Sequence, residues 1–239
     1  MILNIYKDTD DLTTALADWI CSEVQKRLIT QSRFTIALSG GNTPKQLFSK
    51  LASPPYNKKI DWSRMHIFWG DERLVPFEDE RNNANMAFRE LLNKVMVPES
   101  QVHVMRTDIS AKASSIEYDQ LLKSYFDKSK TSFDIILLGL GEDGHTLSLF
   151  PGIDIADNSN RWVLPVYLPS QKMWRITLTP AIVNRAAAVA FMVSGSSKAG
   201  IFKEVLQGDN FYPAKLIQPA NGELYWFIDE QANGHPKMY

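Results

Sequence analysis

The segment from Gly139 to Pro151, GLGEDGHTLSLFP, holds the densest group of residues that could carry chemistry. Three glycines, two acids and His145 lie within its first seven residues. Histidine can accept and donate protons near neutral pH, and the acids Glu142 and Asp143 could tune or orient its imidazole. The segment predicts general acid–base chemistry centred on His145. The simpler alternative is a structural histidine in a glycine-rich turn.

Asp71 and Arg73 belong to a second charged group, GDER, which directly follows the apolar run MHIFW. In open α/β sheets, ligands bind beyond the carboxyl ends of the strands. Charged residues placed there are therefore candidate catalytic groups. The alternative interpretation of this group is a solvated polar turn.

A third group, Ser39–Lys45 (SGGNTPK), follows the apolar run FTIAL. Gly40 and Gly41 would let the backbone approach a ligand closely, and Thr43 is a suitable N-cap for a helix in which Pro44 comes first. A helix N-terminus presents free N–H groups to an anion. Together with Ser39, these residues form a candidate phosphate site. An ordinary strand-to-helix turn remains the alternative.

Two basic residues complete the candidate set. Arg175 opens the apolar run RITLT, and Lys198 follows Ser194–Ser197 after the apolar run AAVAFMV. A lysine at a helix start is disfavoured by the helix dipole, so a bound anion would help to explain it. A solvated surface lysine is the alternative for Lys198.

The remaining reactive residue types give weaker signals. His66 lies within an expected strand, and His103 and His235 lack converging polar neighbours in the sequence. The single cysteine, Cys21, excludes an intrachain disulfide and a zinc site built on paired cysteines, and it is expected to be a buried structural thiol. No metal site is predicted, because no H-E-x-x-H or comparable spacing occurs. A serine nucleophile elbow and a dinucleotide fingerprint are also absent, so no dinucleotide cofactor is expected.

The elements that must position these groups alternate along the chain. Short apolar runs predict strands, and several are apolar throughout, which is typical of parallel strands covered on both faces. Segments of helical periodicity separate them. The alternation predicts an α/β fold with a mostly parallel sheet, organised as one domain over residues 1–239. The expected strands are 34–38, 65–69, 133–138, 187–193 and 224–228, and the expected helices are 10–28, 83–95, 114–126 and 198–206.

Composition limits the class of protein. The 26 basic and 27 acidic residues give a formal net charge of -1, which argues against a protein that binds nucleic acid in bulk. No stretch of about 18 apolar residues is present, so no membrane partner is expected. The N-terminal apolar run is too short for a signal peptide. These features predict a cytoplasmic protein, and the sequence says nothing about its oligomeric state.

The motifs SGGNTPK, GDERLVP, GLGEDGHTLSLFP, RITLT, GSSK and PAKLIQP occur here in an order that resembles the 6-phosphogluconolactonases. The resemblance spans roughly residues 35–220. It implies a Rossmann-like α/β/α sandwich and hydrolysis of 6-phospho-D-glucono-1,5-lactone in the oxidative pentose phosphate pathway, without a metal or organic cofactor. Its substrate would be a small sugar phosphate. One departure is Asn82-Asn83-Ala84, where such proteins often read Ser-Asn-Tyr.

The glucosamine-6-phosphate deaminases are the nearest alternative, because they share the Asp-Gly-His element. Their pattern tends to place a Glu-Pro pair after it, whereas Phe150 precedes Pro151 here. They also tend to read Asp-Glu-Tyr where this chain has Asp71-Glu72-Arg73. Both differences favour the lactonase. A sugar-phosphate-binding regulator without activity is a further alternative, but it would not need a proton-transfer group such as His145.

Overall fold

The computed structural model describes residues 1–153 and 161–234. Its main sheet has six parallel strands in the order β1-β9-β8-β5-β2-β3. This arrangement confirms the predicted mostly parallel sheet. The strands are β1 (Ile2–Tyr6), β2 (Phe34–Leu38), β3 (Met65–Trp69), β5 (Ile135–Gly139), β8 (Ala188–Val193) and β9 (Glu223–Asp229).

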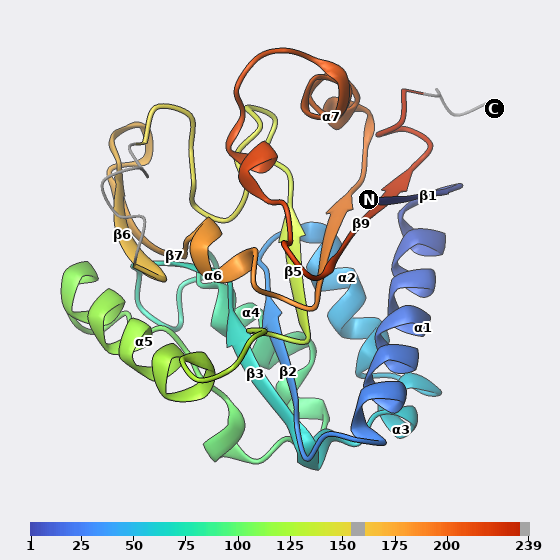
Figure 1. Ribbon diagram of the computed structural model, residues 1–239, viewed down its shortest axis with the longest axis vertical. Helices are drawn as coiled ribbons and strands as arrows, with labels where there is room; N and C mark the ends of the chain where they lie inside the picture. The colour runs from blue at the N-terminus through green and yellow to red at the C-terminus, as the bar shows by residue number, and fades with distance from the viewer. Residues whose placement is uncertain (154–160, 235–239) are drawn as a thin grey trace.

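Helices cover both faces of this sheet, with α1 and α5 on opposite sides (Figure 1). Side chains that alternate along the central strands enter two separate apolar clusters. Ile36 and Leu38 join a cluster with α1 and α2, whereas Ala37 joins a cluster with α5 and α7. The fully apolar strands are thus buried on both faces, as predicted. The helices are α1 (Thr9–Leu28), α2 (Asn42–Leu51), α3 (Tyr56–Lys59), α4 (Asn83–Glu90), α5 (Ala111–Phe126), α6 (Pro180–Val183) and α7 (Ala199–Gln207).

The first helix shows how the sequence sets an element. Asp8 is the N-cap of α1, and its side chain accepts hydrogen bonds from the backbone N–H groups of Asp10 and Asp11.

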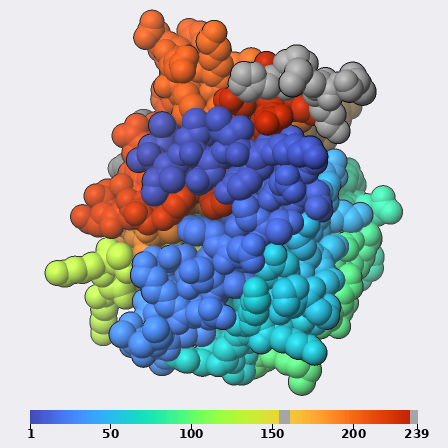
Figure 2. Space-filling view, turned by 90° about the vertical axis from the view of Figure 1, so that its right-hand side faces the viewer, coloured from blue at the N-terminus to red at the C-terminus, as the bar shows by residue number. Residues whose placement is uncertain are grey.

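The first strand, β1, pairs with the last strand, β9, so the N-terminal and C-terminal parts of the sheet lie side by side. Figure 2 shows this face, where the blue N-terminal residues lie directly beside red C-terminal ones.

A second, antiparallel sheet was not predicted. Its order is β4-β7-β6, formed by β4 (Asp71–Arg73), β7 (Met173–Leu178) and β6 (Val163–Leu168). The interpretation of the charged group after β3 as a solvated turn is therefore wrong. Asp71 and Glu72 are buried, because β7 pairs with β4 and covers it.

Some predicted boundaries also need correction. Helix α4 ends at Glu90 rather than at Val95, because Leu91 leaves the helical conformation. Helix α2 begins at Asn42 with Gly41 as its N-cap, so Thr43 is not the cap. Gly41 has a φ of 110°, which glycine adopts without steric cost, and this lets the helix begin earlier. Strands β1 and β6 were not predicted.

Candidate active site

The predicted site residues converge at the carboxyl edge of the main sheet. A cavity of about 270 Å³ opens there, between the loops after β2, β5 and β8 and the small sheet. This is the place where ligands bind in open α/β sheets. The cavity is lined by Ser39, Gly40, Asp71, Arg73, Gly139, Leu140, Gly141, His145, Leu147, Phe150, Gln171, Arg175 and Lys198.

His145 is oriented by Asp143. Its Nδ1 donates to Asp143 Oδ1, which also accepts the His145 backbone N–H at 3.1 Å. Burial acts to raise the pKa of Asp143, but the hydrogen bonds from His145 outweigh it and lower that pKa. The carboxylate is therefore an acceptor, and Nδ1 carries the proton. In the neutral imidazole Nε2 then holds the lone pair, and no residue in the described part of the chain bonds it.

The backbone around His145 is shaped to allow this contact. A Cβ atom at Gly141 would collide with His145 Nδ1 and lie 2.6 Å from Asp143 Oδ1, so only glycine fits. Gly141 also donates its N–H to the His145 carbonyl at 2.8 Å, which closes the turn. Leu147 lies in the cavity wall with a φ of 56°, a left-handed conformation that costs energy for leucine. The loop thus contains local strain beside the imidazole.

Arg73 and Arg175 lie side by side across the small sheet. They are paired directly in the register of β4 and β7. The Nε atoms of both are buried without a hydrogen-bond partner in the described residues. Burial, and then repulsion from Arg73, lower the pKa of Arg175. Two close guanidinium groups with unused donors form a strong site for an anion.

Asp71 offsets part of this positive charge. Its carboxylate accepts a hydrogen bond from the Ser148 hydroxyl at 2.6 Å and lies 3.9 Å from Arg175 Nη1. Both contacts are buried, and they connect the histidine-bearing loop to the small sheet. Asp71 therefore holds parts of the site together, and it also lines the cavity.

The predicted phosphate loop contributes only in part. Ser39 and Gly40 line the cavity, whereas Gly41 and Thr43 do not. The Thr43 hydroxyl instead shares a 2.8 Å hydrogen bond with Ser194. A Cβ at Gly40 would collide with Asn83, whose side-chain amide donates to the Asp71 carbonyl at 2.9 Å. Glycine at position 40 thus allows α4 to approach the loop.

Lys198 reaches the cavity from the loop after β8. It is the N-cap of α7, which begins one residue later than predicted, and its Nζ lies 3.9 Å from the carboxylate of Glu142. The loop is held by Asp229 at the end of β9, which accepts the Gly195 N–H at 3.0 Å. Glu142 itself does not line the cavity, but this ion pair places it at the rim.

Sequence reasoning missed three residues around the site. Gln171 accepts from Arg175 Nη2 at 2.6 Å, and Phe150 lines the cavity. Glu72 is fully buried and accepts the backbone N–H groups of Arg73, Asn83 and Ala84. Burial raises its pKa to about 7 despite these hydrogen bonds. Its position between Asp71 and Arg73 after a buried strand was the available signal.

The departure at residue 82 has a local explanation, whereas nothing in the structure explains alanine at position 84. Asn82 is the N-cap of α4, and its side chain accepts from the Asn85 N–H at 2.8 Å. Asparagine and serine are comparable N-caps, so this change preserves the helix start. Ala84 is buried, and its N–H binds Glu72.

His66 and His103 do not line the cavity. The expectation that His103 lacks converging polar neighbours is wrong, because its Nε2 bonds the Tyr125 hydroxyl at 2.9 Å. His66 Nδ1 bonds the same hydroxyl at 3.0 Å. His235 lies outside the described residues. Among the described residues, no group of three or more His, Cys, Asp or Glu side chains could hold a metal ion, and no helix is long and apolar enough to cross a membrane.

A sequence model of the family described as glucosamine-6-phosphate isomerases/6-phosphogluconolactonase matches residues 7–226. The chain belongs to this family. Within it, the 6-phosphogluconolactonase of Synechocystis sp. is 37% identical over 220 residues, which cover 89% of each chain. A solved structure titled devB protein is 32% identical, with a TM-score of 0.90 over 98% of both chains. These matches confirm the predicted family and support an enzyme of the 6-phosphogluconolactonase type.

Other relatives set limits on these inferences. A monomeric glucosamine-6-phosphate deaminase has a TM-score of 0.85 at 17% identity, covering 99% of this chain and 100% of its own. At that identity the match shows the fold alone, so the fold does not separate the two activities. A probable 6-phosphogluconolactonase 4 of Oryza sativa subsp. indica, described as chloroplastic, is 34% identical over 95% of this chain and 74% of its own. The cytoplasmic location stays a prediction.

Proposed function

We propose that this protein hydrolyses 6-phospho-D-glucono-1,5-lactone to 6-phospho-D-gluconate, as the lactonase of the oxidative pentose phosphate pathway. One observation supports the proposal most strongly. An imidazole that Asp143 orients and two arginines line the same cavity, and neither the His145 Nε2 nor the two arginine Nε atoms have a hydrogen-bond partner among the described residues. That combination suits an activated water, a developing negative charge and a phosphate.

In the proposed reaction, the His145 Nε2 lone pair removes a proton from water as the water oxygen attacks the lactone carbonyl carbon. The carbonyl π electrons move to oxygen, and a guanidinium stabilises the resulting oxyanion. When the tetrahedral intermediate collapses, the bond between C1 and the ring oxygen breaks. Protonated His145 returns its proton to that oxygen. Asp143 keeps the imidazole in the required tautomer throughout.

The 6-phosphate would lie among the cationic and backbone donors of the cavity. Arg175, Lys198 and the loop at Ser39–Gly40 supply them. Arg73 lies beside Arg175 and faces either the oxyanion or the phosphate. Binding energy gained at the phosphate would hold the carbonyl near His145. Thr43, which the sequence placed in the phosphate site, takes no part in this proposal because its hydroxyl bonds Ser194.

The test is the rate of opening of freshly generated 6-phosphogluconolactone above its spontaneous hydrolysis, for the wild type and His145→Ala. We expect a large acceleration that is lost in the variant. A folded wild type without acceleration would overturn the proposal. Ammonia release from glucosamine 6-phosphate, measured on the same sample, would then test the deaminase alternative.

A further inference from the structure

Phe150 lies between the two chemical groups of the cavity. Its ring stacks on the His145 imidazole, with centroids 4.0 Å apart and 28° between the ring planes. The Arg175 guanidinium carbon lies 5.9 Å from the centroid of the same ring. Phe150 also lines the cavity. One aromatic side chain therefore contacts both the proton-transfer group and an arginine.

The ring is anchored from the small sheet. Phe150 packs against the apolar cluster that Leu164, Val166 and Leu168 form on β6. Its main chain is held in a turn, because the Ile153 N–H donates to the Phe150 carbonyl at 3.2 Å. Phe150 is therefore supported by the small sheet, whereas the His145 loop follows β5 of the main sheet.

Asp143 alone does not fix the imidazole. Its carboxylate holds the Nδ1 edge, but the ring could still turn about that hydrogen bond and swing Nε2 away from the cavity. Among the aromatic contacts of the described residues, the Phe150 ring is the one that stacks on the imidazole. An edge contact and a face contact together define the plane of the ring. Catalysis by a general base depends on such a fixed direction.

We propose that Phe150 is a positioning residue, which holds the plane of the His145 imidazole so that Nε2 faces the cavity. The proposal rests on the proposed function for its kinetic consequence, but the geometry that it describes can be measured without turnover. Phe150 touches no reacting atom in this scheme and acts through His145.

The kinetic experiment compares Phe150→Leu, Phe150→Tyr and a control, Phe77→Leu. Leucine keeps an apolar side chain but removes the aromatic face, and tyrosine restores it. Phe77 is an exposed phenylalanine that packs edge-on against Phe88 and does not line the cavity. We expect kcat of Phe150→Leu to fall roughly 10- to 100-fold with a smaller change in KM, because a misplaced group about 1 Å from its productive position has effects of that order. Phe150→Tyr should recover most of this loss, and Phe77→Leu, which is the same substitution away from His145, should keep the wild-type kcat.

The second measurement is the NMR spectrum of the His145 ring. In the wild type, the ring current of Phe150 should shift the imidazole carbon-bound protons upfield, and the nitrogen shifts should report a single Nδ1–H tautomer. In Phe150→Leu, the ring-current shift should vanish and a second tautomer should become populated. Spectra of His145→Ala assign the signals.

The outcomes separate the two proposals. If the wild type opens the lactone and Phe150→Leu keeps its kcat, Phe150 only packs and the inference is wrong while the proposed function stands. If the wild type has no lactonase activity but the NMR spectra change as described, the proposed function fails and the positioning role survives. An unchanged imidazole spectrum in Phe150→Leu would contradict the inference whatever the activity.

Discussion

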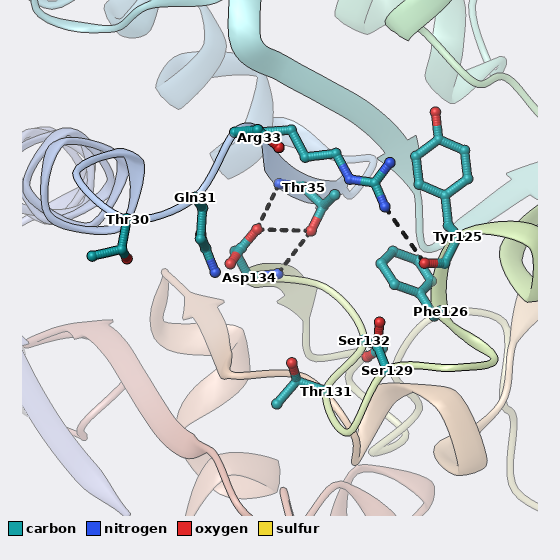
Figure 3. A pocket seen from close by; sticks show the side chains of 11 residues that line it. Thr30, Gln31, Arg33, Thr35, Tyr125, Phe126, Ser129, Thr131, Ser132 and Asp134 are labelled. Carbon is teal, nitrogen blue, oxygen red and sulfur yellow. Dashed lines mark hydrogen bonds between the residues drawn. The ribbon is translucent and has the colours of Figure 1, made fainter.

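The two ends of the main sheet each carry a polar cleft, and the larger one is not the candidate active site. The cleft at the amino end, lined in part by Arg33, Thr35 and Asp134, has a volume of about 370 Å³, against about 270 Å³ for the cavity of His145. Figure 3 shows the amino-end cleft, where Asp134 points at Thr35 and Arg33 reaches toward Tyr125. Size therefore does not distinguish a site from a gap between loops.

Hydrogen-bonding capacity separates the two ends. At the amino end, Asp134 accepts the Thr35 N–H at 2.8 Å and its hydroxyl at 2.9 Å, and Arg27 lies 3.6 Å from the second carboxylate oxygen. The buried carboxylate of Asp134 therefore has its hydrogen bonds and its ion pair within the fold. At the carboxyl end, Arg73 and Arg175 keep buried Nε atoms without partners among the described residues. Buried donors without partners cost stability, and an anion bound in the cavity would supply acceptors for the two guanidinium groups.

The histidines differ in the same way, in whether other residues of the fold occupy their ring nitrogens. His66 and His103 both bond the Tyr125 hydroxyl, and burial lowers the pKa of His103 to about 4. Such a histidine stays neutral and is poorly suited to proton transfer at neutral pH. His145 lines the cavity and bonds Asp143 through Nδ1, while its Nε2 has no partner in the described part of the chain. The comparison teaches that partners, rather than residue type, identify the functional histidine.

The largest expected effect on kcat comes from replacing His145, with a replacement of His103 for comparison. His145→Ala should lower kcat by roughly 10²- to 10⁴-fold, the usual contribution of a general base, while the affinity for 6-phosphogluconate changes little. His103→Gln should keep the wild-type kcat. Stopped-flow or coupled lactonase assays and calorimetric titration with 6-phosphogluconate check both. Equal losses of kcat in the two variants would show that the hydrogen-bond partners of a histidine do not identify its role.

Substitution of an arginine should also change kcat/KM differently at the two ends of the main sheet. Arg175→Lys keeps the charge but loses the planar set of donors, so kcat/KM should fall about 10- to 100-fold. Arg33→Lys, in the amino-end cleft, should leave kcat/KM unchanged. Steady-state kinetics on both variants decide the matter. An unchanged kcat/KM for Arg175→Lys would show that the Arg175 Nε makes no hydrogen bond that the reaction needs.

Lys198→Ala should act mainly on binding. Loss of one charged hydrogen bond to phosphate should raise KM about tenfold with a smaller effect on kcat. Lys203→Ala is the matched control, because Lys203 lies on α7, the helix that Lys198 precedes, and is exposed outside the cavity. A fall in kcat with unchanged KM would instead place Lys198 in the chemical step.

The smallest effect concerns stability rather than rate. The pKa of His103 is about 4 in the folded protein and 6.5 in an unfolded chain, so the unfolded state binds the proton first as pH falls. The stability contributed by neutral His103 is therefore present above about pH 6.5 and is lost as pH falls toward 4. Urea unfolding of the wild type and His103→Gln across this range should show a shallower pH dependence for the variant. Parallel curves would remove His103 as the cause.

The sequence predicted most of the main sheet and the centre of the site. Buried parallel strands have continuous apolar runs, and the glycine-rich segment places His145 after one of them, so both follow from local patterns. The small sheet did not follow, because β4 has only three residues and all are charged. Its burial depends on pairing with β7, about 100 residues later, which no local pattern shows. The same distance hides the pairing of Arg73 with Arg175 and the contact of Phe150 with β6.

The anchoring of the Lys198 loop has a consequence for synthesis. Asp229, which holds the Gly195 N–H and also accepts from the Thr9 hydroxyl at 3.2 Å, lies at the end of the last strand of the sheet. Thr9 begins α1, so Asp229 joins the loop after β8 to the first helix of the fold. The loop that carries one cation of the cavity can therefore reach its final position only after β9 has been translated. A nascent chain stalled before β9 would contain His145, Arg73 and Arg175 and still lack a finished pocket.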